Sequence, residues 1–343
     1  MSAESPVISC RNVWKLFGPN PGQYLSNLTG TPSFEEIREA GYIAAVRDVS
    51  LDIARGEMLV VMGLSGSGKS TLIRCVSRLI EITGGEITVD GQDLGGLSEK
   101  ELIDLRRNKM GMVFQSFGLL PHRTILDNVA FPLEMRGQDR HARRARAMEV
   151  IELVGLAGRE DYYPRELSGG QQQRVGIARS LAIEPDIWFL DEPFSALDPL
   201  IRHDMQDEFL RLQRMLSKTI VFITHDFNEA LRLADRIAIM KDGAVEQCDR
   251  PDRIVMNPAT EYVAKFTKEI DKARVVRAKA LIQPVADAAP EGETIHADQT
   301  LHELARRIVN DPRDAFPVAD KDGALLGIMP RQKALDVLFG DQP

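Results

Sequence analysis

The stretch "GLSGSGKST", Gly63 to Thr71, decides the fold. It fits the pattern G-x-x-x-x-G-K-S/T and lies between the strand-like apolar run "EMLVVMG" and the helical run "TLIRCVSRLIEI". Its glycines let backbone N–H groups surround phosphate oxygens, because no Cβ is in the way. Lys69 supplies a cation, Ser70 a hydroxyl for Mg²⁺, and the helix start its dipole. The residues predicted to bind the nucleotide here are Gly63, Ser65, Gly66, Ser67, Gly68, Lys69, Ser70 and Thr71.

Two carboxylates end another apolar strand, "IWFLDEP". A buried strand that ends in two acids is costly unless they face a cation or a reacting water. We therefore expect Asp191 to hold Mg²⁺ and Glu192 to orient and polarise the attacking water. The alternative is a strand-end pair that meets solvent.

Polar residues also follow two further apolar runs. His225 comes after "TIVFIT", so it should lie at the same sheet edge and contact the γ-phosphate, although a lone histidine here is often structural. Gln115 ends "MGMVFQ" and is placed to reach Mg²⁺ or the water. The predicted catalytic set is thus Glu192, His225 and Gln115, and the predicted metal set is Ser70, Gln115 and Asp191.

A second glycine-rich helix start, "LSGGQQQR", raises the question of a second phosphate. One phosphate loop already satisfies the nucleotide that it holds. The simplest explanation is a second copy of the chain arranged head to tail, so that each nucleotide lies between the Lys69 loop of one copy and the second loop of the other. The residues predicted for this second contact are Ser168, Gly169, Gly170 and Gln171.

Strands that alternate with helices predict an α/β fold with a mostly parallel core sheet. A helical block interrupts it from about 119 to 165, and a hairpin turns at Asp242-Gly243. Residues 19–45 are an insertion in which the Ser33–Glu36 capping-box spacing and Gly41 predict one short helix. Composition suggests a linker over 270–292, and a strand, helix, strand, turn, strand, helix module follows.

Composition limits the classes of function. The 343 residues suffice for two domains, and a net charge of −8 argues against nucleic acid as the main partner. Three widely spaced cysteines form no disulfide or metal pattern, which favours a reducing compartment. The start shows no secretory signal, and no run approaches the roughly 20 apolar residues of a membrane span. Work at a membrane would therefore require docking on another protein.

Taken together, these motifs resemble those of the ABC-type ATPases over roughly residues 7–268. The motifs and residues on which the resemblance rests are, in chain order, "GLSGSGKST", Gln115, "LSGGQQQR", "WFLDEP", "SALD" and His225. The resemblance implies a P-loop NTPase fold with an antiparallel β subdomain and an inserted helical subdomain at about 98–175. It implies that Ser195 to Asp198 join the two sites across the dimer, with Asp198 near the nucleotide. It places Phe17 at the adenine-stacking position, with edge-strand packing as the alternative.

A finer resemblance is to the ATPases of bacterial osmoprotectant importers for glycine betaine, choline or proline betaine. It rests on the 19–45 insertion, "RLIEITGGEI", "MVFQSFGLLPHRTILDNVAF", "FSALDPLIRHDMQDEF" and a single CBS-like module in "DAFPVADKDGALLGI". It implies an ATPase domain over 1–269, a linker over 270–292 and a small α+β CBS-like regulatory module over 293–343. It implies ATP and Mg²⁺ as ligands, and peripheral attachment to the cytoplasmic face of the bacterial inner membrane. The implied partners are permease subunits and, indirectly, an extracytoplasmic solute-binding protein.

Other functions stay open at this point. A soluble ABC ATPase acting on DNA or the ribosome usually carries tandem ATPase domains or a long coiled coil, and this chain has neither. A purely regulatory nucleotide-binding protein would lack the catalytic carboxylate, whereas Glu192 is present. Within transport, an importer for another solute, such as an amino acid, or an exporter is the alternative. The apolar stretch "SFGLLPHRTILDNVAFPLEM" suggests a groove for a permease helix, unless these residues pack inside the helical block.

Overall fold

The computed structural model describes residues 5–28, 30–114, 118–195, 197–285 and 292–340, and Gln115 lies outside them. The chain divides into two compact units, Met1–Val245 and Glu246–Pro343. Each is described by itself.

A six-stranded sheet forms the centre of the first unit and ends in β10, within which the division falls. Its order is β10-β9-β3-β8-β7-β6. The strands are β3 (Met58–Met62), β6 (Met110–Val113), β7 (Ile187–Asp191), β8 (Thr219–Thr224), β9 (Arg236–Lys241) and β10 (Ala244–Asp249). The β3/β8, β3/β9, β6/β7 and β7/β8 pairs are parallel, which confirms the predicted sheet. β3, β7 and β8 are buried along their whole length, so their sequences are continuously apolar rather than alternating. Their carboxyl ends meet at one edge.

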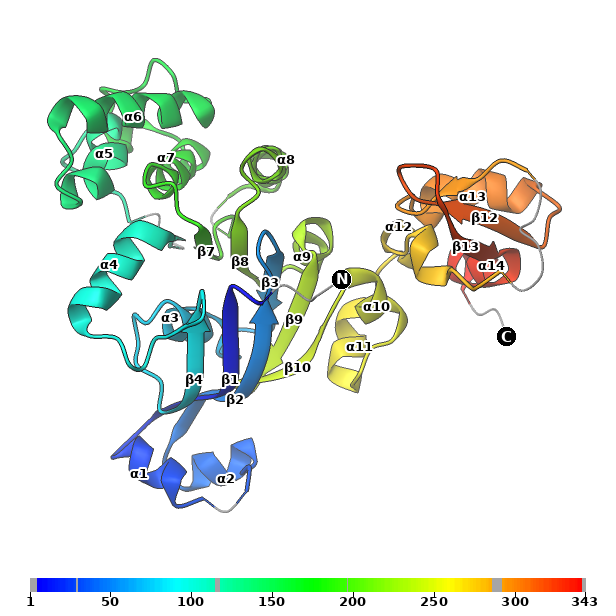
Figure 1. The fold of residues 1–343 in the computed structure, drawn as a ribbon, viewed down its shortest axis with the longest axis horizontal. Coiled ribbons are helices and arrows are strands. Elements are labelled where there is room, and N and C mark those ends of the chain that lie inside the picture. The colour runs from blue at the N-terminus through cyan, green and yellow to red at the C-terminus, as the bar shows by residue number, and fades with distance from the viewer. Residues whose placement is uncertain (1–4, 29, 115–117, 196, 286–291, 341–343) are drawn as a thin grey trace. The chain divides into compact units, whose positions relative to one another are not determined.

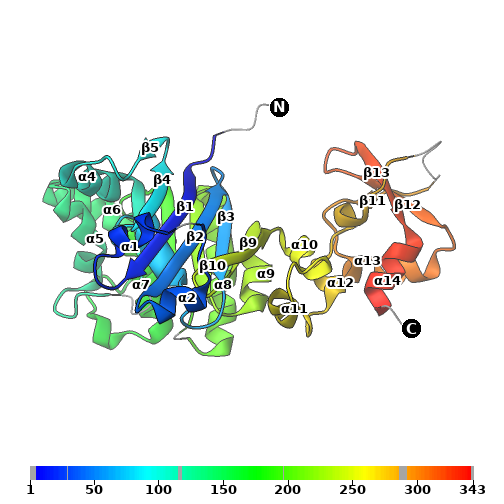
Figure 2. The same cartoon turned by 90° about the horizontal axis from the view of Figure 1, so that it is seen from below.

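An antiparallel sheet of order β2-β1-β4-β5 lies in the same unit. Its strands are β1 (Ile8–Phe17), β2 (Ile43–Ile53), β4 (Gly84–Val89) and β5 (Gln92–Asp93). The insertion between β1 and β2 contains α1 (Pro21–Ser26) and α2 (Phe34–Glu39), which lie at one end of these strands (Figures 1 and 2). The predicted capping box of Ser33 and Glu36 is present, and Gly41 has a φ of 85°, so the predicted helix is confirmed as α2. The helix α1 was not predicted.

Outside the insertion, the helices of this unit either follow a strand of the core sheet or belong to a separate helical region. The helix α3 (Lys69–Val76) follows β3 directly. In the helical region, α5 packs on both α6 and α7 (Figure 1). Its elements are α4 (Glu99–Lys109), α5 (Ile125–Met135), α6 (Arg140–Leu153), η1 (Pro164–Glu166) and α7 (Gly169–Leu181). Two more helices, α8 (Pro199–Leu216) and α9 (Phe227–Leu233), follow β7 and β8. None of the helices in the described ranges is long and apolar enough to traverse a bilayer.

The second unit has its own small core. It contains α10 (Pro251–Met256), α11 (Glu261–Thr267), α12 (Lys272–Val275), η2 (Ala278–Leu281), β11 (Ile295–His296), α13 (Leu301–Asn310), β12 (Ala315–Ala319), β13 (Leu325–Pro330) and α14 (Arg331–Phe339). β12 lies between a parallel β11 and an antiparallel β13. The predicted strand–helix–strand–turn–strand–helix order is therefore observed. Ala273, Val276, Ala278 and Leu281, from the stretch whose composition suggested a linker, are buried in this core.

Candidate nucleotide-binding site

The phosphate loop between β3 and α3 is shaped by glycines that other backbone segments closely approach. Gly63 has a φ of 150° and Gly68, at the N-cap of α3, a φ of 101°. A Cβ on Gly63 would lie 2.2 Å from the carbonyl oxygen of Met240, and a Cβ on Gly68 would lie 2.0 Å from that of Ala45. Neither contact is sterically possible, so both positions require glycine for the loop to pack on β9 and β2.

Gly66 differs from these two glycines. Its φ of 82° favours glycine, but no heavy atom of the described residues lies within 4 Å of the position that a Cβ would take. The loop is therefore open on this side, where a bound group has room. Beside it, the buried Ser67 Oγ has no hydrogen-bond partner within the described part of the chain. A buried polar atom without a partner is costly, and a phosphate oxygen would supply one.

Lys69 lies buried against the loop, with 5% of its surface exposed. Its Nζ donates hydrogen bonds to the carbonyl oxygens of Gly63, at 2.8 Å, and Leu64, at 3.0 Å. Burial lowers the pKa of this ammonium, and the nearby Glu192 and Asp191 oppose the shift. The cation is thus held at the loop, near the carboxylates of Asp191, which ends β7, and Glu192, which follows it.

Ser70 and Asp191 present oxygen ligands next to each other. The Ser70 Oγ donates a hydrogen bond of 2.9 Å to Asp191 Oδ1. Burial raises the pKa of Asp191, which is 5% exposed, and the Ser70 hydroxyl opposes that shift. A cation would stabilise the ionised carboxylate. Among the described residues no cluster of three or more His, Cys, Asp or Glu side chains could hold a metal, so a Mg²⁺ here would take its other ligands from phosphates and water. The donor set fits that ion.

Glu192 and His225 meet at the same sheet edge. The His225 Nδ1 lies 3.0 Å from Glu192 Oε2, and the Glu192 side chain is 18% exposed. Glu192 has a φ of 46°, and its backbone N–H donates to the carbonyl oxygen of Ile223 at 3.1 Å. A left-handed residue other than glycine costs on the order of 1–3 kcal/mol and is typical of functional sites. The carboxylate is consequently fixed where the strands end.

A buried polar pair behind His225 was not predicted. Gln206 of α8 donates from Nε2 to Glu229 Oε1 of α9 at 2.8 Å, and Glu229 is 5% exposed. Burial raises the pKa of Glu229, while hydrogen bonds from Thr224 and Gln206 lower it. Thr224 directly precedes His225, so this pair ties α8 to the segment that carries the histidine. The two residues are separated by 23 positions, and no local pattern joins them.

The second glycine-rich stretch begins α7. The Ser168 Oγ accepts from the backbone N–H of Gln171 at 3.4 Å, and the Gln171 side chain accepts from the Ser168 N–H at 3.0 Å. Ser168 and Gly169 are exposed, whereas Gly170 is buried. The stretch therefore forms a capped helix start whose first backbone groups face outward.

Asp198 precedes α8 and is exposed. Its carbonyl oxygen accepts from the Arg202 N–H at 2.8 Å, and no hydrogen bond from its side chain caps the helix. In the same loop, Ser195 Oγ donates to the carbonyl oxygen of Glu192 at 3.0 Å. The loop that leads to Asp198 is thus tied to the Glu192 backbone.

Phe17 is the last residue of β1 and pairs with Ile43, the first residue of β2. Both are apolar and exposed, at 42% for Phe17 and 67% for Ile43. The Lys15 Nζ lies 4.9 Å from the centre of the Phe17 ring. An exposed aromatic ring of this kind suits a flat, apolar ligand such as a base.

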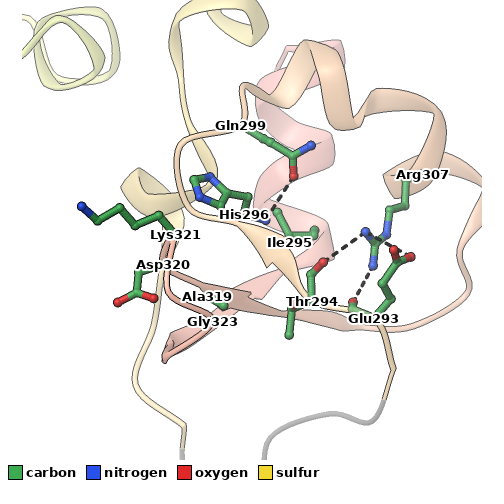
Figure 3. Close-up of a pocket in the computed structure, with 10 residues that line it drawn as sticks. All are labelled: Glu293, Thr294, Ile295, His296, Gln299, Arg307, Ala319, Asp320, Lys321 and Gly323. Carbon is green, nitrogen blue, oxygen red and sulfur yellow. Dashed lines mark hydrogen bonds and ion pairs between the residues drawn. The ribbon is translucent and has the colours of Figure 1, made fainter.

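A cavity of about 520 Å³ in the second unit was not predicted (Figure 3). Its lining residues are Glu293, Thr294, Ile295, His296, Gln299, Arg307, Ala319, Asp320, Lys321 and Gly323. Arg307 donates to the carbonyl oxygen of Thr294, and the His296 Nδ1 accepts from the Asp298 N–H. Acidic and basic groups both line this cavity, so its charge does not select one ligand class.

Comparisons with known proteins show the family to which the chain belongs. The family described as ABC transporter matches residues 46–195. The chain is 77% identical, over 98% of its own length and 98% of the relative's, to the trimethylamine N-oxide transport system ATP-binding protein TmoW of Ruegeria pomeroyi. It is 48% identical, over 83% of this chain and 70% of the relative, to the glycine betaine/proline betaine transport system ATP-binding protein ProV of Escherichia coli.

A solved structure extends the comparison to the fold. The ATP-binding cassette MJ0796, solved as a dimer in a post-hydrolysis state bound to ADP and Pi, has a TM-score of 0.59 and 36% identity. The match covers 71% of this chain and 98% of the cassette. The fold, the phosphate loop and an identity of 77% along nearly the whole chain lead to one conclusion. This chain belongs to the ATP-binding subunits of ABC transporters, which hydrolyse ATP to drive transport.

Proposed function

We propose that this chain energises the import of trimethylamine N-oxide or a chemically similar methylated amine, such as glycine betaine or choline. The observation that carries the solute class is the identity of 77% to TmoW over 98% of both chains. Relatives named for glycine betaine share less, at 42–50% identity. The solute itself would contact the permease and an external binding protein rather than this chain.

The nucleotide site would be completed by a second copy of the chain. The loop from Gly63 to Thr71 would hold the phosphates, and Ser168 to Gln171 of the other copy would close on the γ-phosphate. Asp198 would lie at the junction of the two copies. The dimeric state of MJ0796 with ADP and Pi supports this arrangement.

The proposed catalytic roles are based on the positions of Glu192 and His225 at one edge of the core sheet. Glu192 would accept the proton of the attacking water, and His225, 3.0 Å from it, would orient the carboxylate and contact the γ-phosphate. Ser70 and Asp191 would hold Mg²⁺, which neutralises developing phosphate charge when bound. Gln115, outside the described residues, is proposed for the same metal and water. Phe17 would stack on the adenine.

The remaining assignments concern the organisation of the chain. We propose an ATPase domain over 1–269 and a CBS-like regulatory module over 293–343, with part of the stretch 270–292, whose composition predicted a linker, packed in the core that contains Phe316 of that module. Permease subunits would hold the protein at the cytoplasmic face of the bacterial inner membrane. Phe114, with 39% of its surface exposed, and the partly exposed Leu119 and Leu120 are suited to a permease helix.

A reconstituted transporter tests the proposed solute. The chain, its permease and its binding protein would be assembled in liposomes, and ATP hydrolysis measured with trimethylamine N-oxide, glycine betaine, choline and, as a control, an amino acid. We expect stimulation by a methylated amine and none by the amino acid. Stimulation by the amino acid alone would overturn the solute class but not the ATPase assignment.

A mixed dimer tests the shared site. One copy would carry Ser168→Ala and the other Lys69→Ala, so that one of the two sites contains both lesions and the other contains neither. Head-to-tail sharing predicts one intact site and measurable ATPase in the mixed dimer, against almost none in either variant alone. If each lesion damages its own copy's site instead, no intact site forms and the sharing model is wrong.

A further inference from the structure

The insertion between β1 and β2 connects the two residues that form an exposed apolar pair. It begins after Phe17 and ends before Ile43, which are register partners at the end of the antiparallel sheet. Neither side chain is buried, at 42% and 67% exposure, although both lie next to a well-packed cluster. The fold of the insertion therefore sets where this pair lies.

One aromatic side chain at the end of the insertion contacts the backbone at its beginning. Tyr42 precedes Ile43 directly, and its ring packs on Gly18, which follows Phe17. A Cβ on Gly18 would lie 2.5 Å from Tyr42 Cδ1, and Gly18 has a φ of 152°. The Tyr42 hydroxyl donates a hydrogen bond of 2.8 Å to the carbonyl oxygen of Pro19. Tyr42 thus fixes the backbone immediately after Phe17.

The Tyr42 ring is in turn held by the rest of the insertion. It stacks on Tyr24 of α1, with ring centres 4.1 Å apart and an angle of 21° between the planes. Leu25 of the same helix packs so closely on β4 that a Cβ on Gly84 would lie 2.5 Å from its Cδ2. Ile37 of α2 is fully buried beside Trp14 and Leu16 of β1. The insertion is consequently anchored to the strands that it connects.

We propose that Tyr42 is a positioning residue for the nucleotide base, which it serves by holding Phe17 and Ile43 as one apolar platform. The inference rests on the proposed stacking of adenine on Phe17. Tyr42 touches no reacting atom in this scheme, because its contacts are with Gly18, Pro19 and Tyr24. It also gives the insertion a function: the insertion determines the geometry of base recognition.

The apolar character of the platform agrees with a base rather than a phosphate ligand at this point. The platform consists of a phenyl ring and an aliphatic chain, and the Lys15 Nζ lies 4.9 Å from the centre of the Phe17 ring in a cation–π contact. A base presents a flat face to such a surface, whereas a phosphate would gain little from Phe17 and Ile43. Loss of Tyr42 should accordingly affect ligands that carry a base.

Binding measurements on the full-length chain test this inference. Calorimetric titrations would compare ATP with inorganic tripolyphosphate, which has no base, for Tyr42→Ala, Tyr42→Phe, Gly18→Ala and Phe17→Ala. We expect Phe17→Ala to weaken ATP by on the order of tenfold or more. Tyr42→Ala and Gly18→Ala should approach that loss, and Tyr42→Phe should lose about twofold to fivefold through the missing hydrogen bond. Tripolyphosphate affinity should not change.

Two further comparisons separate positioning from general damage. Phe34→Ala removes another aromatic ring of the same cluster, whereas the three atoms nearest to a Cβ on Gly18 all belong to Tyr42, so this variant reports loosening of the insertion as a whole. We expect it to affect ATP binding less than Tyr42→Ala does. In a Phe17→Ala background, Tyr42→Ala should cause little additional loss, because its effect passes through Phe17.

The outcomes distinguish this inference from the function on which it rests. If Phe17→Ala leaves ATP affinity unchanged, the proposed base stacking is wrong and the inference is overturned with it. If Phe17→Ala weakens ATP but the Tyr42 variants do not, only the role of Tyr42 is overturned. Equal weakening of ATP and tripolyphosphate by Tyr42→Ala would likewise show a structural role alone.

Discussion

Two glycines of the phosphate loop should respond differently to the same added methyl group. Gly66 and Gly68 both have positive φ, at 82° and 101°. A Cβ on Gly66 would meet no heavy atom of the described residues within 4 Å, whereas a Cβ on Gly68 would lie 2.0 Å from the carbonyl oxygen of Ala45. Gly66→Ala therefore strains only the backbone, while Gly68→Ala must also separate the loop from β2.

The two costs can be calculated from these contacts. The left-handed conformation costs alanine about 1–2 kcal/mol at either position. Gly68→Ala adds the cost of overpacking against a backbone atom, about 1–3 kcal/mol, for a total of about 2–5 kcal/mol. For a unit of this size each kcal/mol corresponds to roughly 2–4 °C, so Tm should fall by about 2–8 °C for Gly66→Ala and about 4–20 °C for Gly68→Ala.

The assays are thermal unfolding followed by calorimetry and ATP binding by titration at a temperature where both variants are folded. Because the open side of Gly66 is where we place the phosphates, Gly66→Ala should retain most of its stability but lose about 10- to 100-fold in ATP affinity. A Gly68→Ala protein that melts like the wild type would refute the steric reasoning. Unchanged ATP affinity in Gly66→Ala would refute the placement of the phosphates.

Three other predictions concern carboxylates and thiols. Glu192→Gln should retain ATP binding but lower turnover by about 10²- to 10⁴-fold, and wild-type hydrolysis would contradict its role as the base. Burial raises the pKa of Glu229, so the stability linked to its protonated form is present below its usual value of 4.5 and lost as pH rises through the folded-state pKa. Urea unfolding should consequently show that the free energy of unfolding of Glu229→Gln rises relative to that of the wild type between pH 4 and pH 8. An equal difference between the two proteins at both pH values would count against burial as the cause. Burial also raises the pKa of Cys10 to about 12 and of Cys75 to about 11, so at pH 8 a thiol reagent should label Cys248 first, and fast labelling of all three would contradict this.

The sheet edge for which we propose catalysis could be predicted from the sequence because its signals are local. β7 and β8 are buried on both faces and so appear as apolar runs, and the residues that end them, Asp191, Glu192 and His225, are visible directly in the sequence. The capping box of Ser33 and Glu36 is local in the same sense, since both partners lie within one turn. Such features need no knowledge of the tertiary fold.

Long-range contacts explain what could not be predicted. The short helix α1 has no buried residue of its own, and its Tyr24 stacks on Tyr42, 18 positions later in the sequence. The stretch at 270–292 has the composition of a linker, yet Val276 is buried with Phe316 in the core of the second unit. The buried Gln206–Glu229 pair depends in the same way on α8 packing against α9. Tertiary contacts override composition in all three cases.

The backbone at Glu192 has a consequence for how this protein responds to selection. A glycine there would relieve the strain of a φ of 46° but would remove the carboxylate, whereas Glu192→Gln keeps the strain and loses only the charge. Thermal stability and the catalytic role proposed for Glu192 thus oppose each other at a single position. A laboratory population screened for heat resistance alone would therefore accumulate variants that resist unfolding but no longer hydrolyse ATP.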